Sequence, residues 1–461
     1  MFEKEQIKKN LSIIIVGCGK VGRSLVGQLF KEGHDITIID KKASEIATLT
    51  NMYDIMGIVG NGAIYTTLQE AGIDTADLFI AITDSDELNL LCCTIASQLK
   101  DCATIARVRT PDYTREIEKL KDKLGLAMII NPELESAREI ANILALPSAL
   151  EVTSFAGGQA EMIEYKIPHG SILDDITVAE MNKKVKTTSL ICGVKRGDEV
   201  YIPSGRFVLH EGDIISVVGA RRFAQSFMTD INENARQVKD CMIVGGGRSA
   251  YYLAVNLLRA GIEVKIIESN KARCEELSAL LHKAVIINGD GTDENLLREE
   301  GIEYAESVVP LVGIDEENVI LTLFANQVSN AKVVTKINRT NFKKTISSLN
   351  MGSTVYPQLI TSEAIIAYVR AKSASKERTI ETLYHLYDDR GEALEFNVNE
   401  ASAVTGKTLK ELTLKPNVLI AFINRNGKII IPSGNDSIEV GDTVMVVTTN
   451  IGFNNITDIL K

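Results

Sequence analysis

One long sequence unit occurs twice in this chain, and that repeat limits the folds open to it. Gly17 matches Gly245 at a separation of 228 residues, and Asp40 matches Glu268 at the same separation. The later motifs "YIPSG" and "IIPSG" are 229 residues apart. The 461 residues therefore form two units of about 230 residues each, and not a solenoid of short repeats.

Each unit has two parts with different patterns. Residues 11–130 alternate short apolar, β-rich runs with helical patterns, which is typical of a parallel sheet covered by helices on both faces. A helical stretch follows, and beyond it short strands are separated by polar turns. Two of those turns, "KRGDEV" and "NRNGKI", are typical of hairpins with glycine at positive φ.

We therefore predict an α/β chain with two Rossmann-like doubly wound parallel sheets, each followed by a small α+β domain. The first repeat is divided into residues 11–130, a linking helix at 131–150 and residues 151–230. The second is divided into residues 239–355, a linking helix at 356–378 and residues 379–461. The linking helices could pack on their own sheets or against a partner.

The first repeat carries a glycine turn, G-C-G-K-V-G, between a strand and a helix. Gly17 permits the tight turn, Gly19 lets a pyrophosphate approach the backbone, and Gly22 lets helix and strand pack closely. The helix start offers free N–H groups and a positive dipole end to phosphates. Asp40 ends the next strand, where an acid accepts hydrogen bonds from ribose hydroxyls and disfavours a 2′-phosphate. NAD or an adenine nucleotide therefore fits this site better than NADP.

The second repeat carries the corresponding turn with changes. It has Gly245, Gly246 and Gly247, an alanine at the third position, and Glu268 as the acid. Alanine is an accepted substitute at the packing glycine. A second nucleotide site is therefore expected here. The cations Lys20 and Arg248 start the two helices, where they could face phosphate or only solvent.

Small polar turns follow other strands of the sheet and add candidates. Asn61 follows the third strand, where it could line an adenine or a ribose. Thr83 and Asp84 follow the fourth strand, at the carboxyl edge where such sheets bind ligands. The acids Asp84, Asp86 and Glu87 could equally cap the next helix. Arg107, on the fifth strand, could pair with a phosphate, pair with a neighbouring subunit's carboxylate, or be a plain surface cation; Lys336 takes its place in the second repeat.

Composition excludes several classes of function. The net charge is −11 without a long basic stretch, so nucleic acid is an unexpected partner. No apolar run is long enough for a membrane span, and the N-terminus does not have the pattern of a secretory signal. The seven cysteines, none in a CxxC pair, are expected to be reduced core residues. The five histidines lack metal-ligand spacing, so we predict no metal site.

No constellation for catalysis accompanies the glycine turns. A dehydrogenase needs a proton-transfer group beside the nicotinamide, and neither a His–Asp nor a Lys–Tyr pattern recurs between the repeats. No Walker lysine–serine loop supports ATP hydrolysis. We therefore expect a binding protein rather than an enzyme. The alternatives are an NAD-dependent oxidoreductase with a duplicated domain, and a scaffold whose glycine turns bind nothing.

The ordered set of motifs resembles a known family over essentially the whole chain. "IIIVGCGKVG", "GNG", "EAGIDTADLFIAITDSDELN", "IARVRTPDY", "IPSG" and "EGDIISVVG" are similar to those of the cytosolic regulatory subunits of Trk potassium-uptake systems. These subunits are tandem regulator-of-K⁺-conductance (RCK) units.

The resemblance implies binding of NAD(H), ATP and ADP at both turns. It also implies a homotetrameric ring, in the cytoplasm and peripheral to the membrane, that gates a TrkH-like potassium-translocating subunit. The binding residues it implies are Gly17, Cys18, Gly19, Lys20, Val21, Gly22, Asp40, Asn61, Thr83, Asp84 and Arg107, with Gly245, Gly246, Gly247, Arg248, Ser249 and Glu268 in the second repeat. Ala250 and Lys336 depart from the first repeat and leave the second ligand open, and nothing settles whether the C-terminal domains bind a cyclic dinucleotide or an ion.

Overall fold

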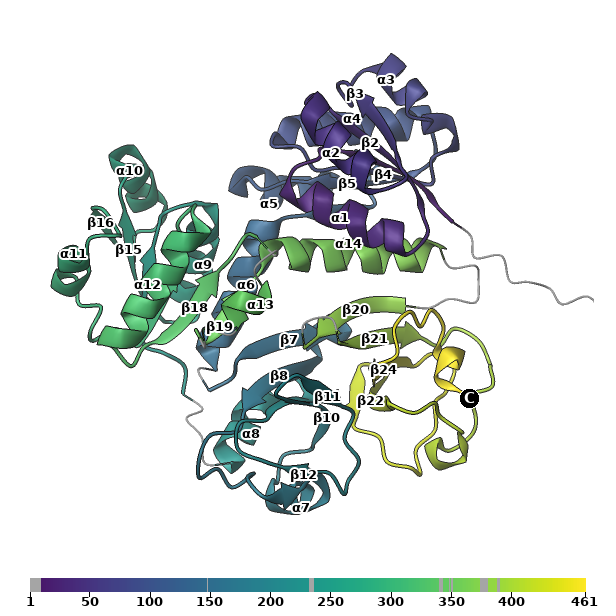
Figure 1. Cartoon of the computed structure of the whole chain (residues 1–461), viewed down its shortest axis with the longest axis vertical. Coiled ribbons are helices and arrows are strands. Elements are labelled where there is room, and N and C mark those ends of the chain that lie inside the picture. The colour runs from purple at the N-terminus through teal and green to yellow at the C-terminus, as the bar shows by residue number, and fades with distance from the viewer. Residues whose placement is uncertain are drawn as a thin grey trace, which may run out of the picture. The chain divides into compact units, whose positions relative to one another are not determined.

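The first repeat begins with a six-stranded parallel sheet (Figure 1). We describe a computed structural model over residues 10–146, 148–231, 236–339, 343–347, 349, 351–373, 380–387 and 390–461. The chain divides into two compact units that do not coincide with the two repeats. The first unit is Met1–Glu135 with Tyr356–Ser375, and the second unit is Ser136–Val355 with Lys376–Lys461.

The first sheet has the strand order β3-β2-β1-β4-β5-β6, so its direction of progress reverses between β1 and β4. Ile13, Ile14 and Ile15 of β1 are fully buried because helices cover both faces of the sheet. The strands are β1 Ser12–Val16, β2 Asp35–Asp40, β3 Met56–Val59, β4 Leu78–Ala81, β5 Ala103–Arg107 and β6 Met128–Ile130. The helices are α1 Lys20–Lys31, α2 Ala43–Met52, α3 Tyr65–Glu70, α4 Asp86–Leu99 and α5 Pro111–Leu120.

The second repeat builds the same sheet, in the order β16-β15-β14-β17-β18-β19. The predicted fold class, with two doubly wound parallel sheets, is confirmed. The strands are β14 Asp240–Val244, β15 Glu263–Glu268, β16 Val285–Asn288, β17 Ser307–Pro310, β18 Lys332–Lys336 and β19 Ser353–Val355. The helices are α9 Arg248–Arg259, α10 Lys271–Leu280, α11 Glu294–Glu299, α12 Asp315–Val328 and α13 Lys343–Ser347.

A five-stranded antiparallel sheet follows each parallel sheet, in the orders β11-β10-β13-β8-β7 and β20-β21-β24-β22-β23. The predicted hairpin turns are confirmed, since Gly197, Asn426 and Gly427 have positive φ. The first domain contains β7 Glu151–Phe155, β8 Ala160–Lys166, β9 Ile176–Thr177, α7 Val178–Lys184, β10 Ser189–Arg196, β11 Glu199–Tyr201, β12 Val208–Leu209, β13 Ile214–Ala220 and α8 Phe223–Asp230. The second contains β20 Ile380–Leu386, β21 Gly391–Asn397, β22 Val418–Arg425, β23 Lys428–Ile430 and β24 Thr443–Thr448.

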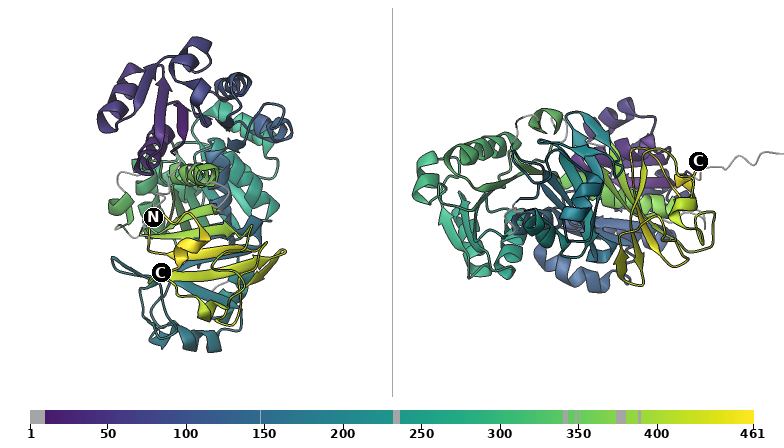
Figure 2. Two further views of the ribbon diagram at one scale, coloured as in Figure 1. Left: turned by 90° about the vertical axis from the view of Figure 1, so that its right-hand side faces the viewer. Right: turned by 90° about the horizontal axis from the view of Figure 1, so that it is seen from below.

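The two antiparallel sheets pack against each other within the second unit (Figures 1 and 2). Phe155 and Met162 of the first domain share one apolar cluster with Phe422 of the second. The hydroxyl groups of Tyr387 and Ser216 lie 2.6 Å apart across this cluster. These small domains therefore bury a common core.

The second linking helix packs on the first repeat. This helix, α14 Pro357–Ser373, lies beside α1 in Figure 1. Ser362 Oγ donates to Ser24 Oγ at 3.3 Å, and Arg370 Nε donates to Glu32 Oε1 at 2.9 Å. The sequence left open whether this helix covers its own sheet, and the structure places it on the other repeat's sheet domain.

The chain after the first linking helix makes a reciprocal contact. That helix, α6, spans Pro132–Ala145. Lys332 Nζ of β18 donates to Ala149 O at 2.7 Å, and Ser353 Oγ of β19 donates to Leu150 O at 2.7 Å. Each linking segment therefore contacts the parallel sheet domain of the other repeat.

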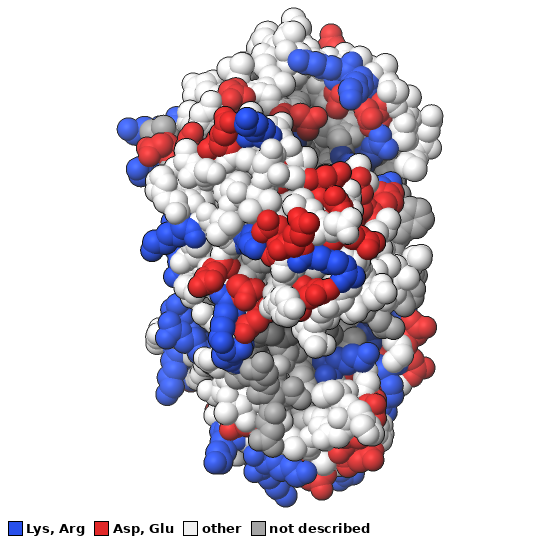
Figure 3. Space-filling model, turned by 90° about the vertical axis from the view of Figure 1, so that its left-hand side faces the viewer, with Lys and Arg blue, Asp and Glu red and all other residues white. Residues whose placement is uncertain are grey.

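The helices and the surface charge agree with the expectations drawn from the apolar runs and the net charge of the sequence. No helix of the described residues combines the length and apolarity needed to cross a membrane. On the face in Figure 3, lysine and arginine side chains are interspersed with aspartate and glutamate, without a continuous basic stripe among the residues drawn in colour.

Candidate nucleotide-binding sites

The turn from β1 to α1 requires glycine at its first position. Gly17 has φ of +104°, and its N–H donates to Ile39 O at 2.9 Å. A Cβ here would lie 2.9 Å from the backbone of Ile82 and Thr83, which directly follow β4. A Cβ at Gly22 would lie 2.2 Å from Gly17 O, so α1 packs directly against the turn.

Gly19 and Gly247 differ from the other turn glycines because they face open space. Each is exposed, and a Cβ built on either would meet nothing within 4 Å. Each is the N-cap of its helix without a side-chain capping bond, and neither α1 nor α9 has an acid in its first turn. The first N–H groups of these helices are therefore open to an external anion.

The second turn repeats the geometry of the first. Gly245 has φ of +101°, and its N–H donates to Ile267 O at 2.8 Å. Arg248 and Ser249 begin α9, as Lys20 and Val21 begin α1.

The acids at the ends of β2 and β15 bind the turns in the same way. Asp40 Oδ2 accepts from Cys18 N at 2.7 Å, and its Oδ1 accepts from Lys42 N at 2.9 Å. Glu268 Oε2 accepts from Gly246 N at 2.6 Å, and its Oε1 accepts from Asn270 N at 2.7 Å. Each carboxylate joins the glycine turn to the start of the next helix.

The cysteine of the first turn is structural. Cys18 is 1% exposed, and burial together with the nearby Asp40 carboxylate raises the pKa of its thiol to about 12. The thiol is therefore protonated at neutral pH. All seven cysteines are free and buried, as expected of core cysteines.

The carboxyl ends of β4 and β5 are joined by a residue that the sequence reasoning missed. Asn89, on α4, is fully buried; its Oδ1 accepts from Thr83 N at 2.7 Å, and its Nδ2 donates to Arg107 O at 2.9 Å. Asn318 makes the same two types of bond with Val312 and Lys336. The recurrence of this asparagine in "SDELN" and "IDEEN" could have identified it from the sequence.

Arg107 is held at this edge with unused hydrogen-bonding capacity. Its Nη2 donates to Thr83 O at 2.5 Å and lies 3.2 Å from Asp84 Oδ1. Arg107 is 9% exposed, and its buried Nε has no hydrogen-bond partner among the described residues. Burial and the neighbouring Arg109 lower the pKa of the guanidinium below its ordinary value. Such a donor fits an anionic group on a ligand.

The N-cap of α4 is a serine and not one of the acids for which capping was the alternative. Ser85 is the N-cap of α4, and its side chain accepts from Leu88 N. Asp86 is 4% exposed and accepts from the N–H groups of Arg109 at 2.9 Å and Thr110 at 2.8 Å. Asp86 therefore fixes the loop after β5 and is not a ligand group.

The turn after the third strand lies next to the acid in both repeats. Gly60 N donates to Asp40 O at 2.9 Å, and Asn61 follows it. Gly289 N donates to Glu268 O at 3.0 Å, and Asp290 follows it. The structure thus brings the predicted Asn61 close to Asp40.

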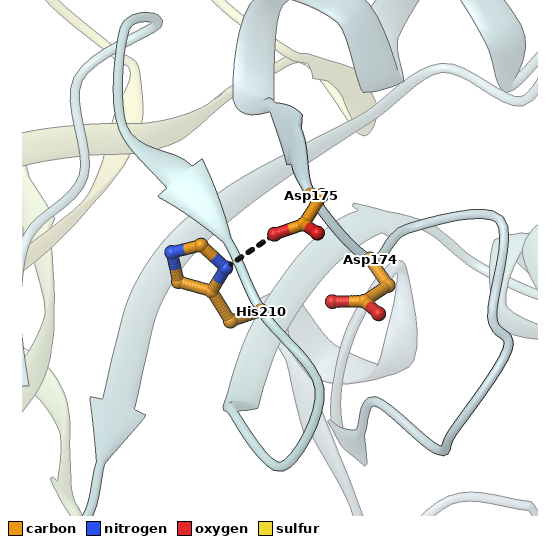
Figure 4. A group of neighbouring side chains, drawn as sticks. All are labelled: Asp174, Asp175 and His210. Carbon is orange, nitrogen blue, oxygen red and sulfur yellow. Dashed lines mark hydrogen bonds and ion pairs between the residues drawn. The ribbon is translucent and has the colours of Figure 1, made fainter.

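One group of possible metal ligands lies away from these sites. Asp174, Asp175 and His210 have ligand atoms within 4.8 Å of one another, and Figure 4 shows His210 paired with Asp175. The sequence spacing did not suggest this group, because 35 residues separate Asp175 from His210. Thr405 and Gly406 stand at the corresponding places in the second repeat.

Known families match both parts of both repeats. The TrkA-N domain matches residues 13–132 and 241–357, and the TrkA-C domain matches residues 162–228 and 393–461. This chain belongs to the TrkA family.

The TrkA relatives are similar over nearly their whole length. The chain is 30% identical over 444 residues to "Trk system potassium uptake protein TrkA homolog 1" of Methanosarcina mazei, which covers 95% of this chain and 97% of the relative. It is also 30% identical over 444 residues to the TrkA protein of Haemophilus influenzae, with 95% of each chain covered. Among solved structures, "GsuK channel bound to NAD" has the same fold, with a TM-score of 0.64 at 18% identity, covering 95% of this chain and 77% of that chain.

Proposed function

We propose that this protein is the ligand-sensing regulatory subunit of a Trk-type potassium-uptake system. NAD(H), ATP or ADP binds at the two glycine turns, and its occupancy controls a TrkH-like potassium-translocating membrane subunit. The protein acts without catalysis, as a homotetrameric ring in the cytoplasm that is peripheral to the membrane through that subunit.

The observation that carries this proposal is the pair of open helix starts. At Gly19 and Gly247 no side chain caps the helix, and a Cβ would meet nothing within 4 Å. The acids Asp40 and Glu268 lie beside the turns, where ribose hydroxyls would donate to them. This arrangement suits the adenosine diphosphate part that NAD, ADP and ATP share. The names of the TrkA relatives agree with it, as does the NAD bound to the GsuK channel of the same fold.

The packing of α1 supplies a route from binding to conformation. Lys20, at the start of α1, would lie against the diphosphate, while Ser24 and Glu32 of the same helix contact α14. A nucleotide can bias the protein only if it binds two conformations with different affinity. A shift of α1 against α14 is the simplest difference between two such conformations.

Potassium uptake by cells that lack this protein tests the proposal. We expect the unsubstituted chain to restore uptake and the double variant Gly19→Leu, Gly247→Leu to lose its response to cellular nucleotide. The matched control is Gly205→Leu, Gly434→Leu, at exposed glycines outside the turns where a Cβ makes only ordinary contacts. Equal uptake by the double variant and the control, with unchanged nucleotide response, would contradict the proposal.

A further inference from the structure

The two candidate sites differ in charge on the ribose side. In both repeats this side is built from the acid that ends the second strand, the two residues after it, and the middle residue of the turn after the third strand. These residues are Asp40, Lys41, Lys42 and Asn61 in the first site, and Glu268, Ser269, Asn270 and Asp290 in the second.

The acids themselves are matched, so they do not cause the difference. Each carboxylate accepts one N–H from its glycine turn and one from the residue two positions ahead, Lys42 or Asn270. Asp40 and Glu268 therefore have the same partners and face the same part of a ligand.

The residues beside the acids carry the difference. Lys41 and Lys42 are exposed and follow Asp40 directly, while Ser269 and Asn270 are uncharged at the same places. The two lysines outweigh one aspartate and give the first ribose side a formal charge of +1.

The third-strand turn adds to the contrast. Asn61 is neutral and its Oδ1 accepts from Ala63 N at 3.1 Å. Asp290 is exposed, and its Oδ1 accepts from Thr292 N at 2.9 Å. These bonds from the backbone and hydroxyl of Thr292 lower the pKa of Asp290, which keeps it ionised. With Glu268 it gives the second ribose side a formal charge of −2.

Nearby ion pairs leave this balance unchanged. In the first site Arg23 pairs with Glu45, and in the second Arg273 pairs with Glu276. Each pair is neutral as a whole, and in each site the arginine also donates to the carbonyl of the middle turn residue.

We propose that the second site accepts only nucleotides with a free ribose 2′-hydroxyl, whereas the first site also accepts 2′-phosphorylated nucleotides of the NADP(H) type. This inference rests on the proposed function. At the first site Asp40 alone would disfavour a 2′-phosphate, as expected from the sequence, but the two lysines directly after it reverse the local charge. At the second site the phosphate meets two carboxylates, and the residues directly after Glu268 are uncharged.

Calorimetric titration of the full chain with NADH and with NADPH tests the proposal one site at a time. Gly247→Leu leaves the first site open, and Gly19→Leu leaves the second open. We expect NADPH to bind the first site within about tenfold of NADH, and the second site at least about a hundredfold more weakly than NADH, because the lysines attract the phosphate and the carboxylates repel it.

Exchange of the ribose-side residues gives the second arm. In the Gly19→Leu background, Ser269→Lys with Asn270→Lys and Asp290→Asn is expected to reduce discrimination against NADPH at least about tenfold. Ser269→Gln with Asn270→Gln and Asp290→Glu is the matched control, because it changes size and keeps charge. Melting curves without nucleotide establish that each variant is folded.

The outcomes separate this inference from the proposed function. Equal NADPH-to-NADH ratios at the two sites, with tight NADH binding at both, would overturn the inference and leave the proposed function standing. A failure of NADH, ATP and ADP to bind either site in the unsubstituted chain would overturn both. The inference would also be refuted if the control variant, which changes side-chain size and keeps charge, reduced the discrimination against NADPH as much as the lysine variant.

Discussion

A leucine at Gly19 should separate ligand binding from folding. The Cβ of this residue would meet nothing within 4 Å, and its φ of −64° is open to any residue. Loss of a glycine N-cap costs a few tenths of a kcal/mol to about 1 kcal/mol, and removal of glycine from the unfolded chain returns about 0.4–1 kcal/mol. We therefore expect the free energy of unfolding without ligand to change by less than about 1 kcal/mol.

The same leucine would occupy the space in which the diphosphate meets the helix start. A ligand at a hundred times its Kd stabilises the folded state by about 2.7 kcal/mol, which corresponds to a rise in Tm of about 5–10 °C for a unit of this size. With NADH, the Tm of the chain that keeps Gly19 should show this rise, and Gly19→Leu should lose it. Scanning fluorimetry with and without NADH, in a Gly247→Leu background, measures the first site alone.

Gly17→Ala is the informative contrast. Its φ of +104° is strained for alanine, and the Cβ would lie 2.9 Å from the Ile82 and Thr83 backbone. We expect a loss of about 2–4 kcal/mol without ligand. If Gly19→Leu kept the full NADH-induced shift, or destabilised the free protein as much as Gly17→Ala, the assignment of Gly19 to the ligand space would be wrong.

Three further predictions concern buried polar groups. Burial lowers the pKa of Lys332 from 10.5 to about 8, so between these values the unfolded chain binds more protons at this lysine. Chemical denaturation of the unsubstituted chain and of Lys332→Met at each pH should therefore give a difference in the free energy of unfolding that grows by about 3 kcal/mol in favour of the unsubstituted chain from pH 8 to 10.5. Burial opposes ionisation of Asp86, but hydrogen bonds from Thr110 and Arg109 outweigh it and lower its pKa; Asp86→Ala should cost about 2–3 kcal/mol at pH 7 by urea unfolding, with a difference that shrinks as the pH falls below 4. Tyr387→Phe should cost about 1–2 kcal/mol by the same method, because Ser216 loses its partner in the shared core; no change would mean that this bond is dispensable.

Much of the fold was predictable because it depends on local sequence patterns. The apolar runs of β1 to β6 alternate with helical stretches, and a parallel sheet with right-handed crossovers is the common way to bury such runs. The glycine turn was predictable for the same reason, since Gly17 needs a positive φ that the sequence signals directly.

Features that depend on contacts between distant segments were not predictable. Asn89 acts by bonding to Thr83, just after β4, and to Arg107, at the end of β5, and helix periodicity does not reveal those partners. Asp86 looked like either a helix cap or a ligand group until its bonds to the loop after β5 decided the matter. The packing partner of α14 was equally open, because the apolar residues of a linking helix can pack on its own sheet or on another.

The position of α14 explains why two repeats in one chain can act together. Its side contacts α1, whose N-terminus is the proposed diphosphate site, and its first residue, Pro357, follows β19 of the second sheet with one residue between them. Helix α14 therefore connects the proposed first site to the second repeat. It belongs to the second repeat in sequence and packs in the first compact unit. If the two proposed sites prefer different nucleotides, the packing of α14 on α1 would let one chain respond to both, and neither repeat alone would contain this contact.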